Sequence, residues 1–130
     1  MKRGFTLIEL MLVVIIIGIL SAMVMPRLAG RSEQARVQAA KSDIESSLAL
    51  ALDLYEMDMG TYPSNLEYLY SQPPSLENWQ GPYIKKKATD PWGQNYMYKF
   101  PGEHNQSSFD LYSAGKDGQP GTKDDVTNWE

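Results

Sequence analysis

Three aspartates near the C-terminus form a candidate metal site. Asp117, Asp124 and Asp125 lie within nine residues, and the glycines and proline between them allow the backbone to turn and present carbonyl oxygens. Calcium takes about six to eight oxygen ligands, which such a loop can supply. The spacing is not that of an EF-hand, because Asn128 stands where the closing Glu would be. The spacing alone is consistent with either a calcium site or a solvated acidic turn.

A single carboxylate, Glu9, interrupts an apolar run that extends from Leu7 to Met25. At a helical rise of about 1.5 Å per residue, this run reaches about 28 Å, close to the ~30 Å hydrocarbon thickness of a bilayer. An ionisable group costs on the order of 2.5–3.5 kcal/mol at the bilayer centre and less near an end. The charge on Glu9 therefore needs a partner or a function.

Two ordinary explanations of this segment are incomplete. A secretory signal peptide fits poorly, because the apolar run is too long and Leu20 stands where cleavage after Ala22 would need a small residue. A plain signal anchor fits the length of the run but leaves Glu9 unexplained.

Few other residues suggest chemistry. The sequence shows no nucleophile paired with a base, no phosphate-binding glycine loop and no cluster of His and Cys, so an enzyme is not expected. We interpret the single histidine, His104, as structural or solvated. Trp79, Trp92 and Trp129 are interpreted as core or interface residues.

Composition narrows the classes of partner. The chain has no cysteine, so neither disulfides nor thiolate metal sites are available. Its net charge of −4 comes from residues 101–130, which hold six acidic and two basic side chains, whereas residues 1–100 hold ten of each. This acidic excess argues against nucleic acid as a partner. Lys85–Lys87 is interpreted as a solvated charge run.

The helical elements follow from periodicity. Apolar residues recur every three or four positions from Val37 to Met59, which predicts a helix with one buried face. Gly60 is expected to end it. Together with the apolar run, this predicts one helix from Phe5 to Met59, about 80 Å long. Pro26 predicts a kink or local unwinding near Ala22 to Pro26.

The rest of the chain predicts a small antiparallel sheet. Asn95–Phe100 and Phe109–Ser113 alternate as strands do, with a hairpin loop between them. Tyr83–Ile84 is a possible further short strand, and Asn65–Tyr70 is expected to form a helical turn or two. The predicted fold class is α+β, with a long bent N-terminal helix packed on a small antiparallel sheet of two to four strands.

The N-terminal residues Gly4-Phe5-Thr6-Leu7-Ile8-Glu9 resemble the leader junction of the type IV pilin and pseudopilin superfamily. The resemblance implies cleavage by a prepilin peptidase between Gly4 and Phe5, followed by N-methylation of Phe5. A new amino group on Phe5 would place a positive charge at a helix N-terminus, where the helix dipole disfavours it. Glu9 could pair with this amine in its own chain or in a neighbouring subunit, and the resemblance associates Glu9 with filament assembly.

The C-terminal motifs point to a narrower family than the leader junction does. Asp90-Pro91-Trp92-Gly93, Ser113-Ala114-Gly115-Lys116-Asp117-Gly118 and Gly121-Thr122-Lys123-Asp124-Asp125 resemble the major pseudopilins of type II secretion systems. The resemblance implies that Asp117, Asp124 and Asp125 bind calcium, helped by main-chain oxygens of Ala114 and Thr122. It also implies a type IV pilin-like fold.

The expected organisation has three parts. Residues 1–4 form the leader, residues 5–26 form the transmembrane and filament-core helix, and residues 27–130 form a periplasmic domain that includes the C-terminal half of the long helix. The resemblance implies a single-pass protein of the bacterial inner membrane. Assembled subunits are expected to form a periplasmic pseudopilus.

The function that the resemblance implies is structural. The processed subunit is expected to polymerise with copies of itself into a helical filament that drives protein export across the outer membrane. Expected partners also include minor pseudopilins and the inner-membrane assembly platform of the secretion system. The alternative is a type IV pilin with an adhesive or DNA-uptake role.

Overall fold

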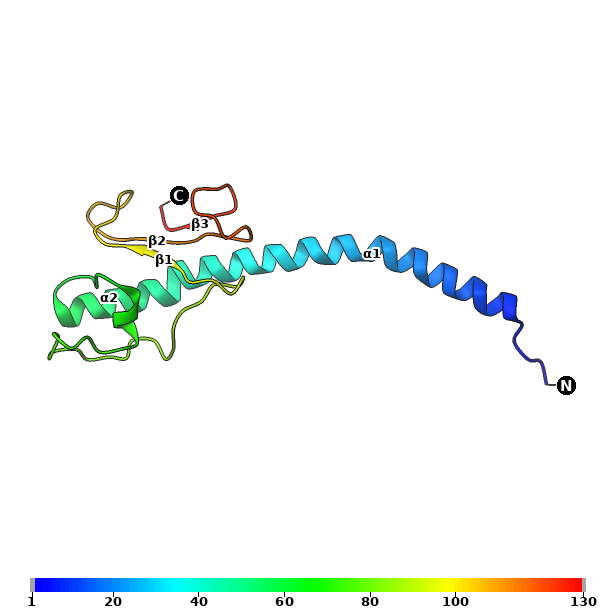
Figure 1. The fold of residues 1–130 in the computed structure, drawn as a ribbon, viewed down its shortest axis with the longest axis horizontal. Helices are drawn as coiled ribbons and strands as arrows, with labels where there is room; N and C mark the ends of the chain where they lie inside the picture. The colour runs from blue at the N-terminus through cyan, green and yellow to red at the C-terminus, as the bar shows by residue number, and fades with distance from the viewer. Residues whose placement is uncertain (1, 130) are drawn as a thin grey trace. The chain divides into compact units, whose positions relative to one another are not determined.

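Most of the N-terminal half of the chain is helical. The computed structural model describes residues 2–129. Helix α1 spans Leu7–Ser42, a π-helical turn follows at Asp43–Ser47, and helix α2 spans Leu48–Met59 (Figure 1). The predicted helix is therefore confirmed, although it begins at Leu7 rather than Phe5. Local unwinding near Pro26 is not seen, because α1 is helical through this residue, and a kink there stays a prediction.

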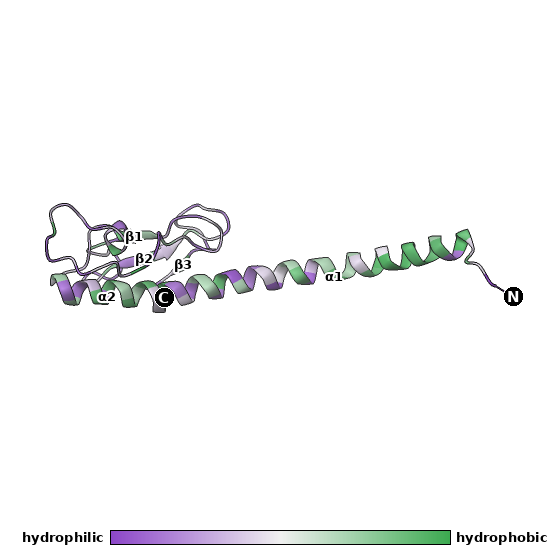
Figure 2. Cartoon of the chain, turned by 90° about the horizontal axis from the view of Figure 1, so that it is seen from below, coloured by the Kyte–Doolittle hydropathy of each residue, from purple (hydrophilic) through white to green (hydrophobic). Residues whose placement is uncertain are grey.

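The chain divides into two compact units, Met1–Ala35 and Arg36–Glu130. In the first unit no residue from Lys2 to Ala35 is buried, so its large apolar side chains are exposed. Figure 2 shows that hydrophobic residues follow one another along the N-terminal part of α1. By length and composition, this helix is apolar enough to cross a membrane. Its exposed apolar surface is compatible with membrane anchoring.

The second unit has a hydrophobic core between its helical segment and its sheet. Ile44, Leu48 and Ala51 are almost fully buried on the helical side, as the periodicity predicted. Leu69 and Leu111 are fully buried in the same core. The π-helical turn joins two stretches of this buried face, since Ile44 lies within it and Leu48 follows it. A left-handed Gly60, with φ of 82°, ends α2 where the sequence predicted.

The sheet has three antiparallel strands in the order β1-β2-β3, which are Met97–Lys99, Asp110–Ser113 and Val126–Thr127. Tyr98 pairs with Leu111, and Ser113 pairs with Val126. The two predicted strands are thus confirmed, in shorter form. The structure matches the predicted class of one long helix packed on a small antiparallel sheet.

The sequence also suggested a short strand at Tyr83–Ile84, and this prediction is wrong. Both backbone N–H groups of this pair donate to the carbonyl of Leu69, at 2.7 and 3.2 Å, so they are not available to a strand ladder. Leu69 ends the short 3₁₀ helix Leu66–Leu69, which confirms the helical turn expected there. Asn65 caps the N-terminus of this 3₁₀ helix, because its side chain accepts from the N–H of Glu67 at 3.0 Å.

Candidate metal site and helix N-terminus

The acidic loop runs from residue 114 to residue 125 and joins β2 to β3. Because Ser113 is paired with Val126, the two ends of this loop are held side by side by the sheet. The ligand oxygens of Asp117, Asp124 and Asp125 lie within 4.8 Å of one another. The fold therefore gathers the three carboxylates that the sequence singled out.

Hydrogen bonds within the loop hold these carboxylates in place. The N–H of Asp117 donates to Asp124 Oδ2 at 2.9 Å, and the N–H of Gly121 donates to Asp125 Oδ2 at 2.7 Å. The hydroxyl of Thr122 and the N–H of Asp117 lower the pKa of Asp124, because both donate to its charged form. The loop thus favours an ionised Asp124 close to two other carboxylates.

The two expected main-chain ligands lie in different environments. Ala114 is buried, whereas Thr122 is exposed and its carbonyl accepts from the N–H of Asp125 at 3.3 Å. The Thr122 hydroxyl contacts the carboxylates of both Asp124 and Asp125. Sequence reasoning missed this side chain, although its place two and three residues before the aspartates was a readable signal.

A glycine allows the loop to close on itself. Gly115 has φ of 70°, and a Cβ at this position would lie 2.3 Å from the carbonyl oxygen of Asp124. No side chain fits there, so a glycine is needed for this approach. The donor set around the loop consists of oxygen atoms alone, which suits a hard cation such as calcium. The residues present therefore fit the predicted ion.

The N-terminus of α1 carries a capping box. Thr6 immediately precedes the helix, and its Oγ1 accepts from the N–H of Glu9 at 3.3 Å. In return, Glu9 Oε2 accepts from the N–H of Thr6 at 2.8 Å and from its hydroxyl at 3.0 Å. This is the reciprocal Thr-x-x-Glu pattern of helix N-termini. Glu9 thus has a local partner that the sequence analysis did not consider, although the four-residue pattern was visible.

The predicted processing residues lie just before this helix. Gly4 and Phe5 are both exposed and precede the first helical residue, and 86% of the Phe5 surface is accessible. A Cβ added at Gly4 would meet nothing within 4 Å. The bond between Gly4 and Phe5 is therefore accessible in this chain.

A second acidic centre lies at the other end of β2, at its first residue. Asp110 is buried, and its carboxylate accepts from the backbone N–H groups of Glu103, His104 and Asn105 at 2.8–2.9 Å. Burial alone would raise the pKa of Asp110, but the N–H groups of His104 and Asn105 outweigh it and lower this pKa to about 2.

His104 has contacts on two sides. Its Nδ1 lies 3.1 Å from Asp110 Oδ2, and its ring stacks on Trp129 with centroids 4.0 Å apart and planes at 2°. The histidine therefore joins the hairpin loop to the C-terminal segment, two regions that are 25 residues apart in sequence.

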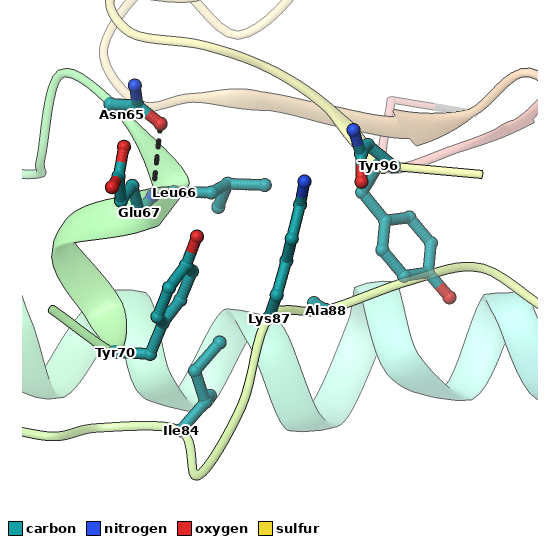
Figure 3. Close-up of a pocket in the computed structure, with 9 residues that line it drawn as sticks. Asn65, Leu66, Glu67, Tyr70, Ile84, Lys87, Ala88 and Tyr96 are labelled. Atoms are coloured by element: carbon teal, nitrogen blue, oxygen red, sulfur yellow. Dashed lines mark hydrogen bonds between the residues drawn. The ribbon is translucent and has the colours of Figure 1, made fainter. Parts of the chain in front are cut away.

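The lysine run lies near a separate pocket of about 250 Å³. Figure 3 shows Lys87 extending across this pocket between Tyr70 and Tyr96. Lys85–Lys87 is exposed, as the interpretation of a solvated run requires. The acidic loop contributes no residue to the lining of this pocket, so the pocket does not extend the candidate metal site.

The fold and the helix N-terminus define a pilin-like protein, with one long N-terminal helix packed on a small antiparallel sheet. A family model described as type II secretion system protein G matches residues 27–129, and one described as the prokaryotic N-terminal methylation motif matches residues 1–25. The chain belongs to the type II secretion system protein G family.

Named relatives agree with this assignment. The chain is 46% identical over 135 residues to the type II secretion system core protein G of Escherichia coli K12, covering 98% of this chain and 91% of that protein. It is 47% identical over 139 residues to the protein of the same name from Pseudomonas aeruginosa, covering 99% and 96%.

A solved structure has the same fold. It is the crystal structure of the major pseudopilin from the type 2 secretion system of enterohaemorrhagic Escherichia coli. The TM-score is 0.66 at 34% identity, and the match covers 78% of this chain and 89% of that one. This likeness confirms the predicted fold class.

Proposed function

We propose that the chain is a structural subunit of a type II secretion pseudopilus and acts by polymerising with copies of itself. The observation that carries this proposal is the exposed apolar surface of α1 in a chain of this family. No residue from Leu7 to Leu28 is buried, so this surface needs lipid before assembly or other helices after it. Growth of the filament would then drive protein export across the outer membrane.

The proposed life cycle begins in the inner membrane. Residues 5–26 cross the bilayer once, and the domain from residue 27 onward lies in the periplasm. A prepilin peptidase removes residues 1–4 and the new amino group of Phe5 is methylated, which the match to the methylation motif supports. Minor pseudopilins and the assembly platform of the inner membrane are the further proposed partners.

The proposed role is therefore assembly and not catalysis. The alternative, a type IV pilin used for adhesion or DNA uptake, is disfavoured because the domain itself matches the secretion family over residues 27–129. The acidic excess of residues 101–130 also disfavours DNA as a ligand.

Calcium is the proposed cofactor. The ion would be held by Asp117, Asp124 and Asp125, with main-chain oxygens of Ala114 and Thr122 completing the site. The support is the gathering of three carboxylates within 4.8 Å in a loop closed by β2 and β3. Bound calcium supplies two positive charges, which offset the mutual repulsion of the aspartates and so order the loop.

Glu9 has a proposed role in assembly that depends on its charge and is additional to its part in the capping box. In an assembled filament the Glu9 carboxylate of one subunit would pair with the Phe5 amine of a neighbour, because an unpaired charge is costly in an apolar core. Two variants separate the charge from the cap. Glu9→Gln keeps a side chain that can cap Thr6 but removes the charge, whereas Thr6→Ala removes the cap hydroxyl and keeps the charge.

The test expresses both variants in cells that carry the complete secretion system. Intact mass should show the loss of Met1–Gly4 and one added methyl group for the wild type. Filament yield and secretion should fall strongly for Glu9→Gln and only slightly for Thr6→Ala. Normal filaments from Glu9→Gln would refute the charge pairing, and recovery of only the unprocessed chain would refute the maturation.

A further inference from the structure

A buried carboxylate outside the acidic loop is connected to it by hydrogen bonds. Asp90 is 5% exposed and lies in the turn before β1. Its Oδ1 accepts from the N–H groups of Trp92 and Gln94, at 3.1 and 2.8 Å. Its Oδ2 accepts from the hydroxyl of Ser113 at 2.6 Å, a contact between residues 23 positions apart. The carboxylate therefore holds its own turn with one oxygen and the end of β2 with the other.

Ser113 passes this connection into the loop. It is fully buried at the end of β2, and its Oγ accepts from the N–H of Gly115 at 3.1 Å. The hydroxyl donates its only hydrogen to Asp90, so an oxygen lone pair is left for the N–H of Gly115. An ionised carboxylate can only accept, and this fixes the direction of the whole chain of hydrogen bonds.

Gly115 is the point at which the loop meets a predicted metal ligand. The position of a Cβ on Gly115 would be 2.3 Å from the main-chain oxygen of Asp124 and 2.8 Å from its Oδ2. The peptide between Ala114 and Gly115 also carries the carbonyl proposed as a ligand. Holding the N–H of Gly115 therefore fixes the orientation of this peptide and its approach to Asp124.

The turn of Asp90 touches the loop at a second place. A Cβ on Gly118, which has φ of 69°, would lie 2.3 Å from Nε2 of Gln94. Gln94 is also the residue whose N–H donates to Asp90. Two independent contacts thus link the turn to the acidic loop.

We propose that Asp90 and Ser113 are positioning residues of the calcium site, which they serve by fixing the Ala114–Gly115 peptide against Asp124. This inference rests on the proposed calcium binding. Neither side chain is a proposed ligand, and both act through the loop backbone. Residues that orient metal ligands in this way typically change affinity by about 10- to 100-fold when removed.

The test measures calcium affinity of the full chain in detergent micelles by titration calorimetry. Ser113→Ala should bind calcium about 10- to 100-fold more weakly, because the acceptor for Gly115 is lost. Ser113→Thr keeps the hydroxyl and should recover affinity. Asp90→Asn should also weaken binding, because an amide facing Ser113 would donate a hydrogen and leave the serine hydroxyl without its acceptor.

A matched control removes one hydrogen bond elsewhere in the domain. Tyr98 donates its hydroxyl to the carbonyl of Pro63 at 2.6 Å, outside the acidic loop. Tyr98→Phe should lower the unfolding temperature and leave calcium affinity unchanged. The control therefore shows whether a general loss of stability is enough to weaken calcium binding, or whether the hydrogen bonds of Asp90 and Ser113 are specifically needed.

Hydrogen exchange at the Gly115 amide gives a reading that needs no ion. In calcium-free protein this amide should be protected in the wild type and in Ser113→Thr, and it should exchange faster in Ser113→Ala. Tight calcium binding by the wild type with unchanged affinity in Ser113→Ala would overturn this inference alone. Absence of calcium binding by the wild type would overturn the cofactor proposal, and this inference with it.

Discussion

Both ends of β2 have buried or clustered aspartate, but the loops that adjoin them balance its negative charge in different ways. At the N-terminal end, the loop of residues 100–109 wraps three backbone N–H groups around the single carboxylate of Asp110. At the C-terminal end, the acidic loop brings three carboxylates within 4.8 Å of one another. The first loop satisfies its charge with its own backbone, whereas the second concentrates charge that a cation can offset.

This difference distinguishes a carboxylate whose charge the backbone already balances from carboxylates that are proposed to bind a cation. Asp110 has a pKa of about 2 because its donors are already in place. The same donors make a cation unnecessary there. We therefore expect the stability provided by the first loop to be independent of calcium and the stability provided by the second to depend on it.

The largest expected effect is that of Asp110→Ala. The substitution leaves the N–H groups of Glu103, His104 and Asn105 without their acceptor, and we expect it to lower the free energy of unfolding by about 3 kcal/mol. The loss should be equal in calcium and in chelator. Chemical unfolding followed by tryptophan fluorescence measures it, because all three tryptophans lie in the unit Arg36–Glu130.

Glu103→Ala is the control for this experiment. It removes an exposed ion pair with Lys99, and such pairs contribute little to stability, so we expect a much smaller loss than for Asp110→Ala. A loss for Asp110→Ala that disappears when calcium is added would contradict the proposed division between the two loops.

Calcium removal is expected to have the next largest effect. If one ion binds only the folded chain, a hundredfold excess over the dissociation constant adds about 2.7 kcal/mol to the free energy of unfolding. Asp117→Asn should lose this gain in calcium. In chelator the variant should be no less stable than the wild type, because one repelling charge is gone and an amide oxygen can still accept from the N–H of Gln119.

Thermal unfolding of the wild type and Asp117→Asn, each in excess calcium and in chelator, checks this prediction. Equal midpoints for the wild type in both buffers would mean that the loop is a solvated acidic turn.

The smallest expected effect is that of acid in calcium-free buffer. The pKa of Asp110 is about 2 in the folded chain and 3.8 ordinarily, so the unfolded state binds the proton first as pH falls. The stability from this group is present above about pH 4 and is lost between about pH 4 and pH 2. Unfolding curves of the wild type and Asp110→Asn should therefore converge over this interval. Curves that stay parallel would contradict the assignment.

Much of the fold could be predicted from the sequence, because a helix buries residues that are close neighbours along the chain. The three- and four-residue spacing through Ile44, Leu48 and Tyr55 was sufficient to place the buried face, and Gly60 was sufficient to end the helix. The acidic loop was also visible, since its carboxylates lie within nine residues. The capping box of Thr6 and Glu9 was equally local and was overlooked.

The tertiary structure decided which distant groups meet. Asp90 reaches Ser113 across 23 residues, and Asn128 uses its side chain to accept from the N–H of Leu111, 17 residues away. Such contacts depend on the register of β2 with β3 and on how the loops close. The amino acids next to each partner in the sequence specify neither the register nor the loop closure. The sequence by itself therefore determined the helix, its apolar surface and the presence of an acidic loop. Only the packed sheet decided which buried side chains hold that loop in shape, because hydrogen bonds over such separations form only when the register brings donor and acceptor together.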